Sequence, residues 1–490
     1  MKKTLTASVA FAISLLFFAT SCTDKGQETF HYVNLSQVAC SFLGEGNSPL
    51  AVDVKASPAQ WTATPGATWV KIERTDERTL TITVDDNDTG AERNTTVMID
   101  AGQASQTITV TQLPKDSAFA RFRKLDTFQM GAAMSPSGRY VGGFYTDVLG
   151  ENGFQYTAVV IDLETDKWHE FGPYPETLFG FTEAEVVTDQ GVLYISDSTN
   201  GGCVAFDLDG TYTVPKSIAG YGPLVMQSSS VDGSVMVGYT EGTPYGCMYG
   251  PVKVVDGEVK PLPLPEEGNF RNEEWWAGIL ARGMSADGSV AYGSSWENYD
   301  YGMVWWDRDG NVDWVGSDLR KVTTVQREDA LGNPVDYNLV DGMICWANQT
   351  QISPNGTWIA GTYRTEEYDK ENDEVLQANY PAFFNTETKT TTVFDEYAGC
   401  VAMGVTDDGL GLIGIQGMGV NSGFIVDLAS KTKVDDMLPW IRSEFGIIIS
   451  EGAIHYLTPD RQKVFGAKLR YEQNGAVTTL YWYVAPALNN

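Results

Sequence analysis

The sequence predicts an all-β protein of two parts: a small β-sandwich followed by a closed ring of seven four-stranded sheets. Polar and apolar residues alternate with a period of two over residues 27–113, which indicates strands with one buried face. A strand–turn–strand motif built around Ser-x-Asp-Gly then recurs seven times. Glycine, tyrosine and tryptophan, with 50, 23 and 13 copies in 490 residues, also favour turn-rich β structure.

The first 21 residues (1–21) are expected to be a lipoprotein signal peptide. Lys2 and Lys3 precede an apolar run over 7–19 that is too short to span a membrane. The small residues before Cys22 resemble the lipobox of bacterial lipoproteins, which implies cleavage there and lipidation of Cys22. Ordinary cleavage that leaves a free thiol is the alternative. We therefore expect an outer-membrane protein that is lipid-anchored and faces the cell surface.

The chain is strongly acidic. It carries 64 Asp and Glu against 33 Lys and Arg, a formal net charge of −31. A field of that sign repels nucleic acid and anionic lipid head groups. We therefore expect no nucleic-acid partner, contact with the membrane through the lipid anchor only, and a monomer whose acidity serves solubility.

Five cysteines follow Cys22, and no CxxC occurs; they are Cys40, Cys203, Cys247, Cys345 and Cys400. An odd number cannot all pair within one chain. Two disulfides between neighbouring repeats would use matching positions, but we favour buried thiols that act as small hydrophobic residues.

The first module is expected to be a β-sandwich over 27–113. Its clearest strands are 80–86, 95–101 and 105–112. The pattern resembles the BACON domain, an immunoglobulin-like β-sandwich common in surface proteins of Bacteroidetes. The residues that carry the resemblance are Trp69, Val70, Lys71, Ile72, Leu80, Ile82, Val84, Asn87, Arg93, Val97, Ile99, Gly102, Ile108, Val110 and Gln112. The resemblance implies carbohydrate recognition or a spacer role. Trp61 and Trp69 are expected in the core rather than on a sugar-binding surface. Residues 114–118 are expected to form a short linker.

The second part, 118–490, is predicted to be a seven-bladed β-propeller. The repeated hairpins lie at 131–145, 185–198, 228–240, 282–296, 350–363, 403–416 and 454–468. Each is followed by a second hairpin, so that each repeat supplies four antiparallel strands. A single blade cannot bury both faces, but blades stacked around an axis do so, and ring closure removes exposed edges. Asp-Gly supplies the positive φ of a tight turn, and the serine hydroxyl can bind backbone there.

Two irregular segments support closure of the ring. The last repeat lacks a fourth strand, and 118–126 belong to no other blade, so we expect them to supply the missing outer strand. Residues 434–447 break the strand pattern and predict a short helix between the sixth and seventh blades. The repeats resemble the HAF-type repeats of extracellular bacterial proteins and, more loosely, the repeats of TolB. They differ from the sialidase Asp-box, because glycine here follows the aspartate directly.

The candidate ligand site is a group of aromatic residues at one mouth of the ring. Long loops are expected at 269–282, 294–302, 316–348 and 364–380. Aromatic rings with neighbouring carboxylates suit a polyhydroxylated sugar ring. The predicted site residues are Trp275, Trp276, Trp296, Tyr299, Tyr301, Trp346 and Tyr245.

The leading hypothesis is non-catalytic binding of a glycan or glycoprotein. A glycoside hydrolase or polysaccharide lyase that uses carboxylates on the same face is the first alternative, and a protein-interaction scaffold in an outer-membrane complex is the second. No catalytic residue can be named from the sequence, and we expect no cofactor and no metal. The run 307–313 could be a calcium loop, but a plain hairpin turn is favoured. Exposed aromatic residues around one mouth would indicate a binding protein. A deep pocket with two carboxylates of shifted pKa would indicate an enzyme. A broad flat patch without a pocket would indicate a scaffold.

Overall fold

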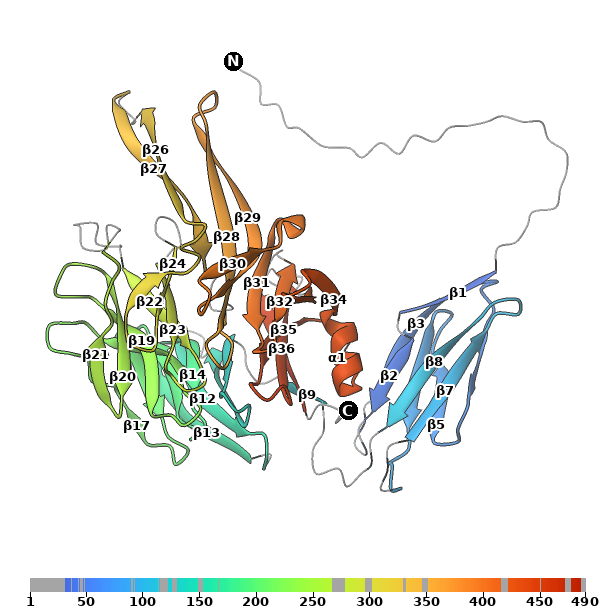
Figure 1. Cartoon of the computed structure of the whole chain (residues 1–490). Helices are drawn as coiled ribbons and strands as arrows, with labels where there is room; N and C mark the ends of the chain where they lie inside the picture. Colours follow the sequence, from blue (N-terminus) through green and yellow to red (C-terminus); the bar gives the residue numbers. More distant parts are fainter. Residues whose placement is uncertain are drawn as a thin grey trace, which may run out of the picture. The chain divides into compact units, whose positions relative to one another are not determined.

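The computed structural model describes two compact units, Met1–Asp116 and Ser117–Asn490 (Figure 1). The described residues are 31–36, 38–42, 44, 47, 49–89, 91, 93–112, 114, 122–125, 130–148, 153–165, 167–266, 278–295, 302–328, 332–345, 351–415, 422–449, 451–471 and 477–485. The expected signal peptide, Cys22 and all of the expected linker except Pro114 lie outside them. Among the described residues, no helix has the length and apolarity that a membrane crossing requires.

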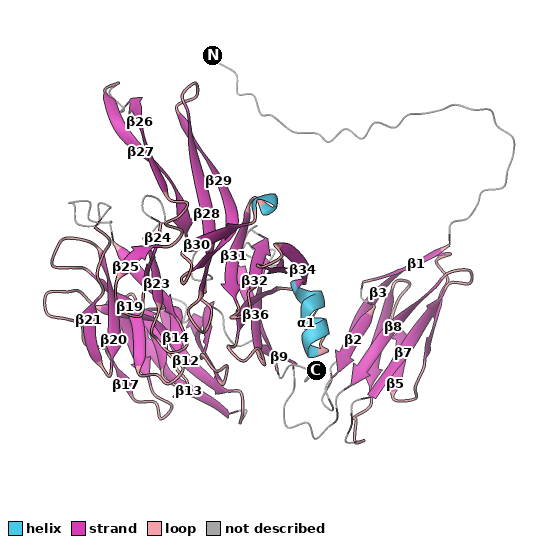
Figure 2. Ribbon diagram, in the orientation of Figure 1, coloured by secondary structure: helices cyan, strands magenta, loops and turns pink. Residues whose placement is uncertain are grey.

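The first unit is a sandwich of two four-stranded sheets (Figure 2). The first sheet has the order β1 (Tyr32–Leu35), β3 (Leu50–Ser57), β6 (Thr79–Val84), β5 (Val70–Arg74). The second has the order β2 (Ala39–Phe42), β8 (Ser105–Gln112), β7 (Arg93–Asp100), β4 (Thr62–Pro65), with β2 and β8 parallel. The three strands expected from alternation are β6, β7 and β8. Because alternate residues of each strand point inward, Leu80, Ile82, Val97 and Ile99 are almost fully buried between the sheets.

The residues that carry the family resemblance are held by contacts inside this sandwich. The Arg93 guanidinium lies 4.3 Å from the Trp69 ring centre, and its Nε donates to Gln112 Oε1 at 2.9 Å. Asn87, which is fully buried, donates through Nδ2 to the Gln112 carbonyl at 3.3 Å. Trp61 is buried in the core. Trp69 is partly buried and packs against the core residues, and Arg93 covers the Trp69 ring. Both tryptophans therefore have the structural role that was expected of them.

The second unit consists of seven sheets (Figures 1 and 2), and in blades 1 to 6 the strands follow chain order within each sheet. Blade 1 has β10 (Met130–Met134), β11 (Tyr140–Val148), β12 (Phe154–Asp162) and β13 (Lys167–Pro175). Blade 2 has β14 (Phe181–Val187), β15 (Leu193–Asp197), β16 (Cys203–Phe206) and β17 (Tyr212–Thr213). Blade 3 has β18 (Leu224–Ser229), β19 (Val235–Glu241), β20 (Tyr249–Val255) and β21 (Glu258–Pro261). Blade 4 has β22 (Ile279–Met284), β23 (Ala291–Ser295), β24 (Met303–Trp306) and β25 (Val312–Trp314).

The remaining blades are less regular. Blade 5 has five strands: β26 (Lys321–Glu328), β27 (Pro334–Ile344), β28 (Trp358–Asp369), β29 (Glu374–Asn385) and β30 (Thr390–Val393), followed by the 3-10 turn η3 (Asp395–Tyr397). Blade 6 has β31 (Cys400–Val405), β32 (Leu410–Ile415), β33 (Gly423–Asp427) and β34 (Thr432–Asp436). Blade 7 has β35 (Ala453–Leu457), β36 (Val464–Tyr471), β37 (Val477–Val484) and β9 (Phe122–Leu125).

The ring is closed by β9, as the sequence predicted. This strand precedes blade 1 in the chain but pairs antiparallel with the last strand, β37, from Leu125 opposite Tyr481 to Phe122 opposite Val484. Leu125 is buried in one apolar cluster with residues of blades 1 and 7. Because β9 covers the outer edge of β37, the last strand of the chain is paired on both sides and blade 7 has four strands.

The helix predicted over 434–447 is α1 (Met437–Phe445). It begins after Asp436 and ends at Gly446, which adopts the left-handed conformation with φ 66°. Its buried face includes Trp440 and Phe445, which pack into one cluster with residues of blades 6 and 7. The helix therefore fills the space between these two blades.

The seven repeated turns share one hydrogen bond. In each, a buried Ser or Thr hydroxyl accepts the backbone N–H at the start of the second strand, at 2.9 to 3.2 Å; these residues are Ser135, Thr188, Ser230, Ser285, Ser353, Thr406 and Thr458. Each turn also has a residue with positive φ, which is glycine in six blades and Arg461 in blade 7. The Ser-x-Asp-Gly motif is thus the device that closes each inner hairpin.

The same turns bind one another around the axis. Ser137 donates to Asp189 between blades 1 and 2, Gln190 to the Asp232 carbonyl between 2 and 3, and Val231 to the Ala286 carbonyl between 3 and 4. Four more links complete the ring. Ala286 N–H donates to the Pro354 carbonyl between blades 4 and 5, and Asn355 N–H donates to Asp407 between blades 5 and 6. Arg461 donates to Asp408 between blades 6 and 7, and Lys463 donates to the Ser137 carbonyl between blades 7 and 1. The links therefore run through all seven blades and return to the first.

Two expectations about loops were wrong. Residues 364–380 are mostly strand, because β28 and β29 pair over twelve positions from Trp358 opposite Asn385 to Asp369 opposite Glu374. Residues 316–348 contain the hairpin of β26 and β27. Both hairpins extend beyond the other strands on one side of the propeller (Figure 1). Polar residues on both faces of these strands hide the alternation that identifies a half-buried strand.

The five cysteines after Cys22 are free thiols, and all but the half-buried Cys400 are buried. Burial raises the pKa of Cys40 and Cys203 to about 12. They act as small hydrophobic residues, and the alternative of two disulfides is wrong.

The closing strand generates a stability prediction. Leu125→Ala removes a buried side chain that joins blades 1 and 7, so it should lower the unfolding free energy of the propeller by about 2–5 kcal/mol. Differential scanning calorimetry measures this as a lower melting temperature for the propeller transition. Leu376→Ala is the matched control, because Leu376 is half exposed on β29. Equal effects of the two substitutions would contradict the closure role of β9.

The turn hydroxyl generates a second prediction. Ser285→Ala leaves the Val290 N–H without its acceptor in a buried site, which should destabilise the propeller by about 1–3 kcal/mol. Ser289→Ala, in the same turn, removes only a hydroxyl bond to the exposed Asp287 and should cost much less. Urea unfolding of both variants checks the difference, and a smaller loss for Ser285→Ala than for Ser289→Ala would refute it.

Candidate functional site

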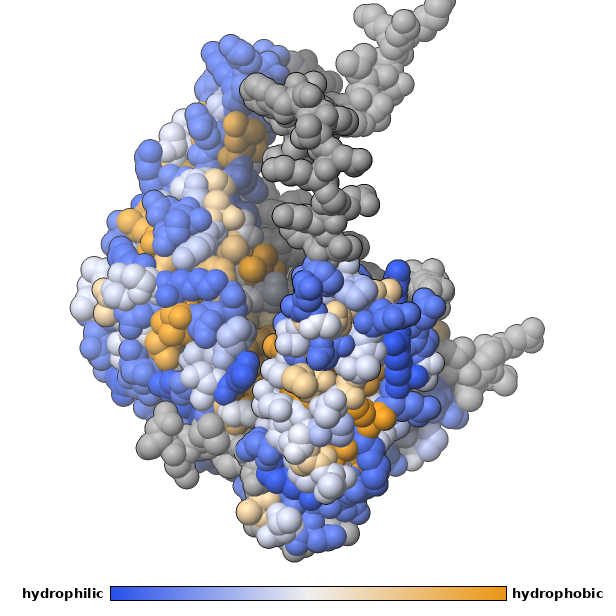
Figure 3. Space-filling view, turned by 90° about the vertical axis from the view of Figure 1, so that its right-hand side faces the viewer, coloured by the Kyte–Doolittle hydropathy of each residue, from blue (hydrophilic) through white to orange (hydrophobic). Residues whose placement is uncertain are grey.

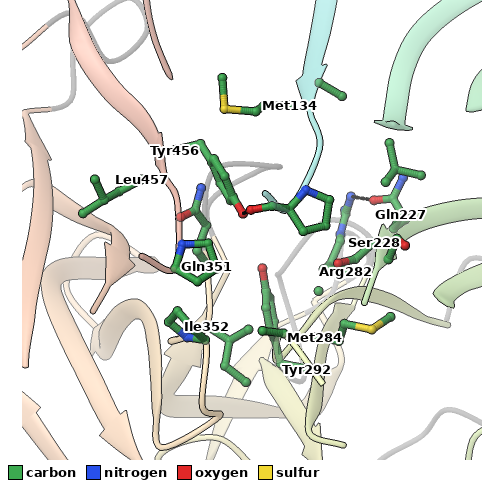
Figure 4. A pocket seen from close by; sticks show the side chains of 18 of the residues that line it. Met134, Gln227, Ser228, Arg282, Met284, Tyr292, Gln351, Ile352, Tyr456 and Leu457 are labelled. Atoms are coloured by element: carbon green, nitrogen blue, oxygen red, sulfur yellow. Dashed lines mark hydrogen bonds between the residues drawn. The ribbon is translucent and has the colours of Figure 1, made fainter. Parts of the chain in front are cut away.

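The axis of the propeller contains a cavity of about 200 Å³ that every blade helps to line (Figure 4). Its lining includes one residue from the inner strand of each blade or from the segment before it: Met134, Glu185, Gln227, Arg282, Ile352, Val405 and Tyr456. Prolines of the inner turns, among them Pro136 and Pro459, lie at one end. This turn-side chamber is the central channel expected of a propeller.

A second cavity of about 500 Å³ lies among blades 2, 3 and 4. It is lined by the loop between β15 and β16, by the end of β19 and by the start of β20. Those segments belong to the side opposite the inner turns, so we call this cavity the mouth chamber. Glu185, Gln227 and Arg282 line both chambers and therefore lie between them.

These three residues occupy equivalent β-bulges. The pairing of each inner strand with the next strand shifts register at Glu185, at Gln227 and at Arg282. Each lies three positions before the buried turn hydroxyl of its blade. A bulge re-aims one side chain relative to the regular alternation of a strand. Three adjacent blades thus direct a carboxylate, an amide and a guanidinium into the same channel.

Hydrogen bonds join the three side chains in a row. Ser196 Oγ donates to Glu185 Oε1, and Gln227 Nε2 donates to Glu185 Oε2. Arg282 Nη1 donates to Gln227 Oε1 at 3.4 Å, the dashed line beside Gln227 in Figure 4, and Arg282 Nε donates to Ser294 at 3.5 Å. Each member therefore orients the next one.

Burial makes Glu185 an unusual carboxyl group. Desolvation raises its pKa to about 8, and the charge of Glu183 adds to the rise, while Ser196, Arg282 and Gln227 oppose it. The group is therefore mostly protonated at neutral pH. Burial also raises the pKa of Tyr239, which lines the mouth chamber.

Carboxylates also shape the mouth chamber. Asp197 accepts the N–H groups of Gly180 at 2.8 Å and Thr199 at 3.0 Å, which holds the loop between β15 and β16. Glu241 accepts the N–H of Gly202 at 2.8 Å. With Glu183, they give the chamber more negative than positive groups.

The aromatic mouth predicted from the sequence is mostly untested. Trp275, Trp276, Trp296, Tyr299, Tyr301 and Trp346 lie outside the described residues. Tyr245 is described: it is 36% exposed, and its ring meets the edge of Tyr221 with 6.4 Å between ring centres. It is not among the residues that line the two chambers. The aromatic mouth therefore stays a prediction.

The run 307–313 forms the turn between β24 and β25. Asp307 Oδ1 accepts the backbone N–H groups of Asp309 and Asn311 at 2.9 and 2.8 Å. The Asp307 carboxylate thus closes a hairpin turn, which is the role that the sequence favoured.

Sequence reasoning missed Glu185, Gln227 and Arg282, although a signal was present. When the repeats are aligned on the turn hydroxyl, the third residue before it is Ala132, Glu185, Gln227, Arg282, Met403 and His455 in blades 1, 2, 3, 4, 6 and 7. Three neighbouring repeats therefore carry long polar groups at a position that faces the axis.

Comparison with known proteins identifies the first unit. Residues 59–113 match the family model BACON, described as "Putative binding domain, N-terminal". No curated protein matches the chain. Within the first unit, the match covers β4 to β8 and includes Trp61, Trp69, Asn87 and Arg93.

Several solved structures are distantly similar. An oligogalacturonate lyase in complex with manganese is 10% identical, with a TM-score of 0.42 over 87% of this chain and 98% of that chain. Polysaccharide lyase Uly1 is 12% identical, with a TM-score of 0.40 over 73% and 90%. The β-propeller domain of the Trilobed protease from Pyrococcus furiosus is 10% identical, with a TM-score of 0.31 over 81% and 95%.

These likenesses are too distant to argue for a shared activity, and the propeller is established by its own strand pairing. Residues 59–113 form a BACON domain, and the unit that follows it in the chain is a seven-bladed β-propeller closed by β9.

Proposed function

We propose that this chain is a lipid-anchored outer-membrane protein whose propeller binds a neutral glycan, free or on a glycoprotein, in the mouth chamber. The observation that carries the proposal is the row of Glu185, Gln227 and Arg282 in the floor of a cavity of about 500 Å³. Small-molecule sites typically have volumes of about 300–1,000 Å³ and a few convergent polar groups.

The chemistry of the lining suits sugar hydroxyl groups. Carboxylates such as Glu183 and Glu241 accept hydrogen bonds from them, and Arg282 donates to them. Tyr239 and Tyr249 meet edge to face with 5.3 Å between ring centres and offer apolar surface to the C–H faces of a ring. The cavity thus combines the two kinds of contact that a pyranose needs.

Charge selects among glycans. Three carboxylates besides Glu185, and one guanidinium, line the mouth chamber, so an anionic sugar would bring like charges together in a partly desolvated site. The net charge of the whole chain has the same sign. We therefore propose a neutral glycan rather than a uronate or a sulfated sugar.

The surface supports a ligand-binding role over a scaffold. On the face shown in Figure 3, hydrophobic residues of the described part form small areas separated by hydrophilic ones. The scaffold hypothesis required a broad flat patch without a pocket, whereas the described residues enclose two cavities. The BACON domain, whose family description is that of a binding domain, is a second candidate for glycan contact.

The membrane anchor rests on the lipobox-like sequence before Cys22. Cys22→Ser should release the chain from the membrane fraction, because the acyl chains attach to the thiol and to the new N-terminus that cleavage creates. Cell fractionation with labelled palmitate checks this. A Cys22→Ser chain that remains labelled and membrane-bound would contradict the anchor.

Arg282 provides the test of the binding site. Arg282→Ala should weaken glycan binding at least tenfold, because it removes a donor from the cavity and frees the Gln227 amide that it orients. A glycan array, followed by calorimetry on residues 25–490, measures the effect. Arg442→Ala, on the exposed side of α1, is the matched control. Trp275→Ala and Trp296→Ala test the aromatic mouth in parallel, and a loss confined to these two would move the site there.

Glu185 gives a pH prediction for stability. Its pKa is about 8 in the folded chain and near 4.5 as an ordinary glutamate, so between these values the folded state binds more protons than the unfolded state. The unfolding free energy contributed by this group therefore falls as pH rises from 4.5 to 8. Glu185→Gln removes that dependence, so it should raise the melting temperature relative to wild type more at pH 8.5 than at pH 5. A difference that does not change with pH would be inconsistent with a protonated Glu185.

A further inference from the structure

We propose that Tyr239 and Glu241 together hold one hydroxyl group of the sugar in the mouth chamber, so that the glycan must carry a free hydroxyl at one defined position. The inference rests on the proposed function, because it concerns the same neutral glycan in the same chamber. It goes beyond that function because it names two residues that select the ligand and the ligands that they reject. Those are sugars that are deoxygenated, methylated or acetylated at that position.

Tyr239 is a buried phenol whose hydroxyl group finds no partner in the described part of the chain. The residue is 8% exposed, and it lines the mouth chamber. A buried tyrosine hydroxyl usually has a hydrogen-bond partner. The described residues give Tyr239 a ring contact with Tyr249 but supply no hydrogen bond to its oxygen. The hydroxyl is therefore available to a partner that enters the chamber.

The Tyr239 oxygen lies at the chamber and not in the closed core. Among the described residues, the buried polar atoms that have neither a partner nor access to solvent do not include it. Four groups act on the charge of the phenol: Glu185, Arg282, Glu241 and Tyr249. All four line the mouth chamber. Because such interactions weaken with distance, the phenol oxygen lies among these lining groups.

Glu241 follows Tyr239 on the same face of β19. The two residues are separated by one position, and alternate side chains of a strand point to the same face, about 7 Å apart along the strand. Thr240, between them, is fully buried, and its hydroxyl donates to the Gly242 carbonyl at 3.1 Å. Tyr239 and Glu241 both line the mouth chamber. The strand therefore presents a phenol and a carboxylate to the ligand as neighbours.

The protein orients the Glu241 carboxylate through one of its oxygens. Glu241 Oε2 accepts the N–H of Gly202 at 2.8 Å, from the loop between β15 and β16. Gly202 has φ 70°, and a Cβ there would lie 2.9 Å from the Leu224 carbonyl oxygen, so the close approach of this N–H requires glycine. A carboxylate offers about four lone-pair sites. The bond to Gly202 uses one of them, so the oriented group can still accept a hydrogen bond from a ligand.

The pair offers one donor and one acceptor to the same ligand atom. Burial raises the pKa of Tyr239 above its ordinary value, so the phenol keeps its proton and can donate. The Glu241 carboxylate can only accept. A sugar hydroxyl accepts from the first and donates to the second through a single oxygen. An ether or carbonyl oxygen cannot donate to Glu241, and an ammonium group cannot accept from Tyr239.

Tyr249 fixes the direction of the phenol hydroxyl. It lies opposite Glu241 in the pairing of β19 with β20. Its ring meets the Tyr239 ring at 88°, with 5.3 Å between ring centres. Because a phenol oxygen lies in the plane of its ring, this contact sets the line along which the Tyr239 hydroxyl points. The hydrogen bond to the ligand is therefore prepared before the ligand arrives.

The other hydroxyl groups of the chamber are bonded to the protein. Ser198 Oγ donates to the Gly180 carbonyl at 3.0 Å, and Thr182 Oγ1 donates to the Ser196 carbonyl at 3.4 Å. Ser196 Oγ itself donates to Glu185. Each of these groups has its proton engaged, which distinguishes them from the Tyr239 hydroxyl.

The test uses residues 25–490 and five neutral trisaccharides: xylotriose, cellotriose, maltotriose, mannotriose and galactotriose. Calorimetry measures Kd for each. Tyr239→Phe keeps the ring and removes the hydroxyl, so it should weaken binding of the preferred trisaccharide about 3- to 10-fold, the effect of one hydrogen bond. Monodeoxy forms of that trisaccharide then locate the hydroxyl that is held. One of them should bind wild type about 10- to 100-fold more weakly, because it leaves both residues without a partner. Tyr239→Phe should bind this one form as well as wild type does.

Two further variants separate ligand contact from a structural role. Tyr212→Phe removes a hydroxyl from a residue that is 43% exposed on β17 and does not line the chamber, so it should leave binding unchanged. In Glu241→Gln the amide oxygen can keep the Gly202 bond, which leaves only the NH₂ end for the ligand. This variant should weaken binding about tenfold. Thermal melting confirms that all three variants fold.

The outcomes distinguish the inference from the proposed function. Absence of binding to every trisaccharide would overturn both. Binding that Arg282→Ala weakens and Tyr239→Phe does not would overturn the inference alone, because water would then be the partner of the hydroxyl. Equal weakening of the parent sugar and of every monodeoxy form by Tyr239→Phe would also overturn it, because the hydroxyl would then support the fold and not the ligand.

Discussion

The propeller depends on a ring of turn-to-turn hydrogen bonds at one end of its axis. A buried hydroxyl first fixes the shape of each inner turn, as Ser230 does by accepting the Val235 N–H. The fixed turn then donates or accepts toward its neighbour, as Val231 does toward the Ala286 carbonyl. The links between blades 3 and 4 and between blades 4 and 5 are backbone-to-backbone bonds, and each of them satisfies one N–H and one carbonyl group. Closure by β9 makes the ring continuous at the outer edge as well.

The candidate site follows from the same constraint. The turn hydroxyl sets the register of each inner strand, and the bulge lies at a fixed distance before it. In blades 2, 3 and 4 the residue three positions before the hydroxyl therefore points to the channel. Glu185, Gln227 and Arg282 meet because the ring brings their three blades side by side, although the three residues are spread over nearly one hundred positions of the chain.

The fold was predictable because its signals are local and repeated. Alternation in β6, β7 and β8, the turn motif, the unpaired last repeat and the helix-breaking pattern around α1 each identify an element from short stretches of sequence. The chemical site was not predicted, because its members are single residues in different repeats and the pKa of Glu185 depends on burial that only the closed ring creates. The long strands β28 and β29 were missed for another reason: their outer halves carry polar residues on both faces, so they lack a hydrophobic period.

A symmetric scaffold thus acquires an asymmetric site by variation at one repeated position. Where that position holds Ala132 or Met403, the side chain adds no charge to the channel; where it holds Glu185 and Arg282, the channel gains an acid and a cation. Gln227 lies between them in the ring. Its amide oxygen accepts a hydrogen bond from Arg282, and its NH₂ group donates one to Glu185. Desolvation raises the pKa of Glu185, and the charge of Arg282 opposes that rise. The order of the three side chains around the ring, and not only their presence, therefore decides which hydrogen bonds each of them makes.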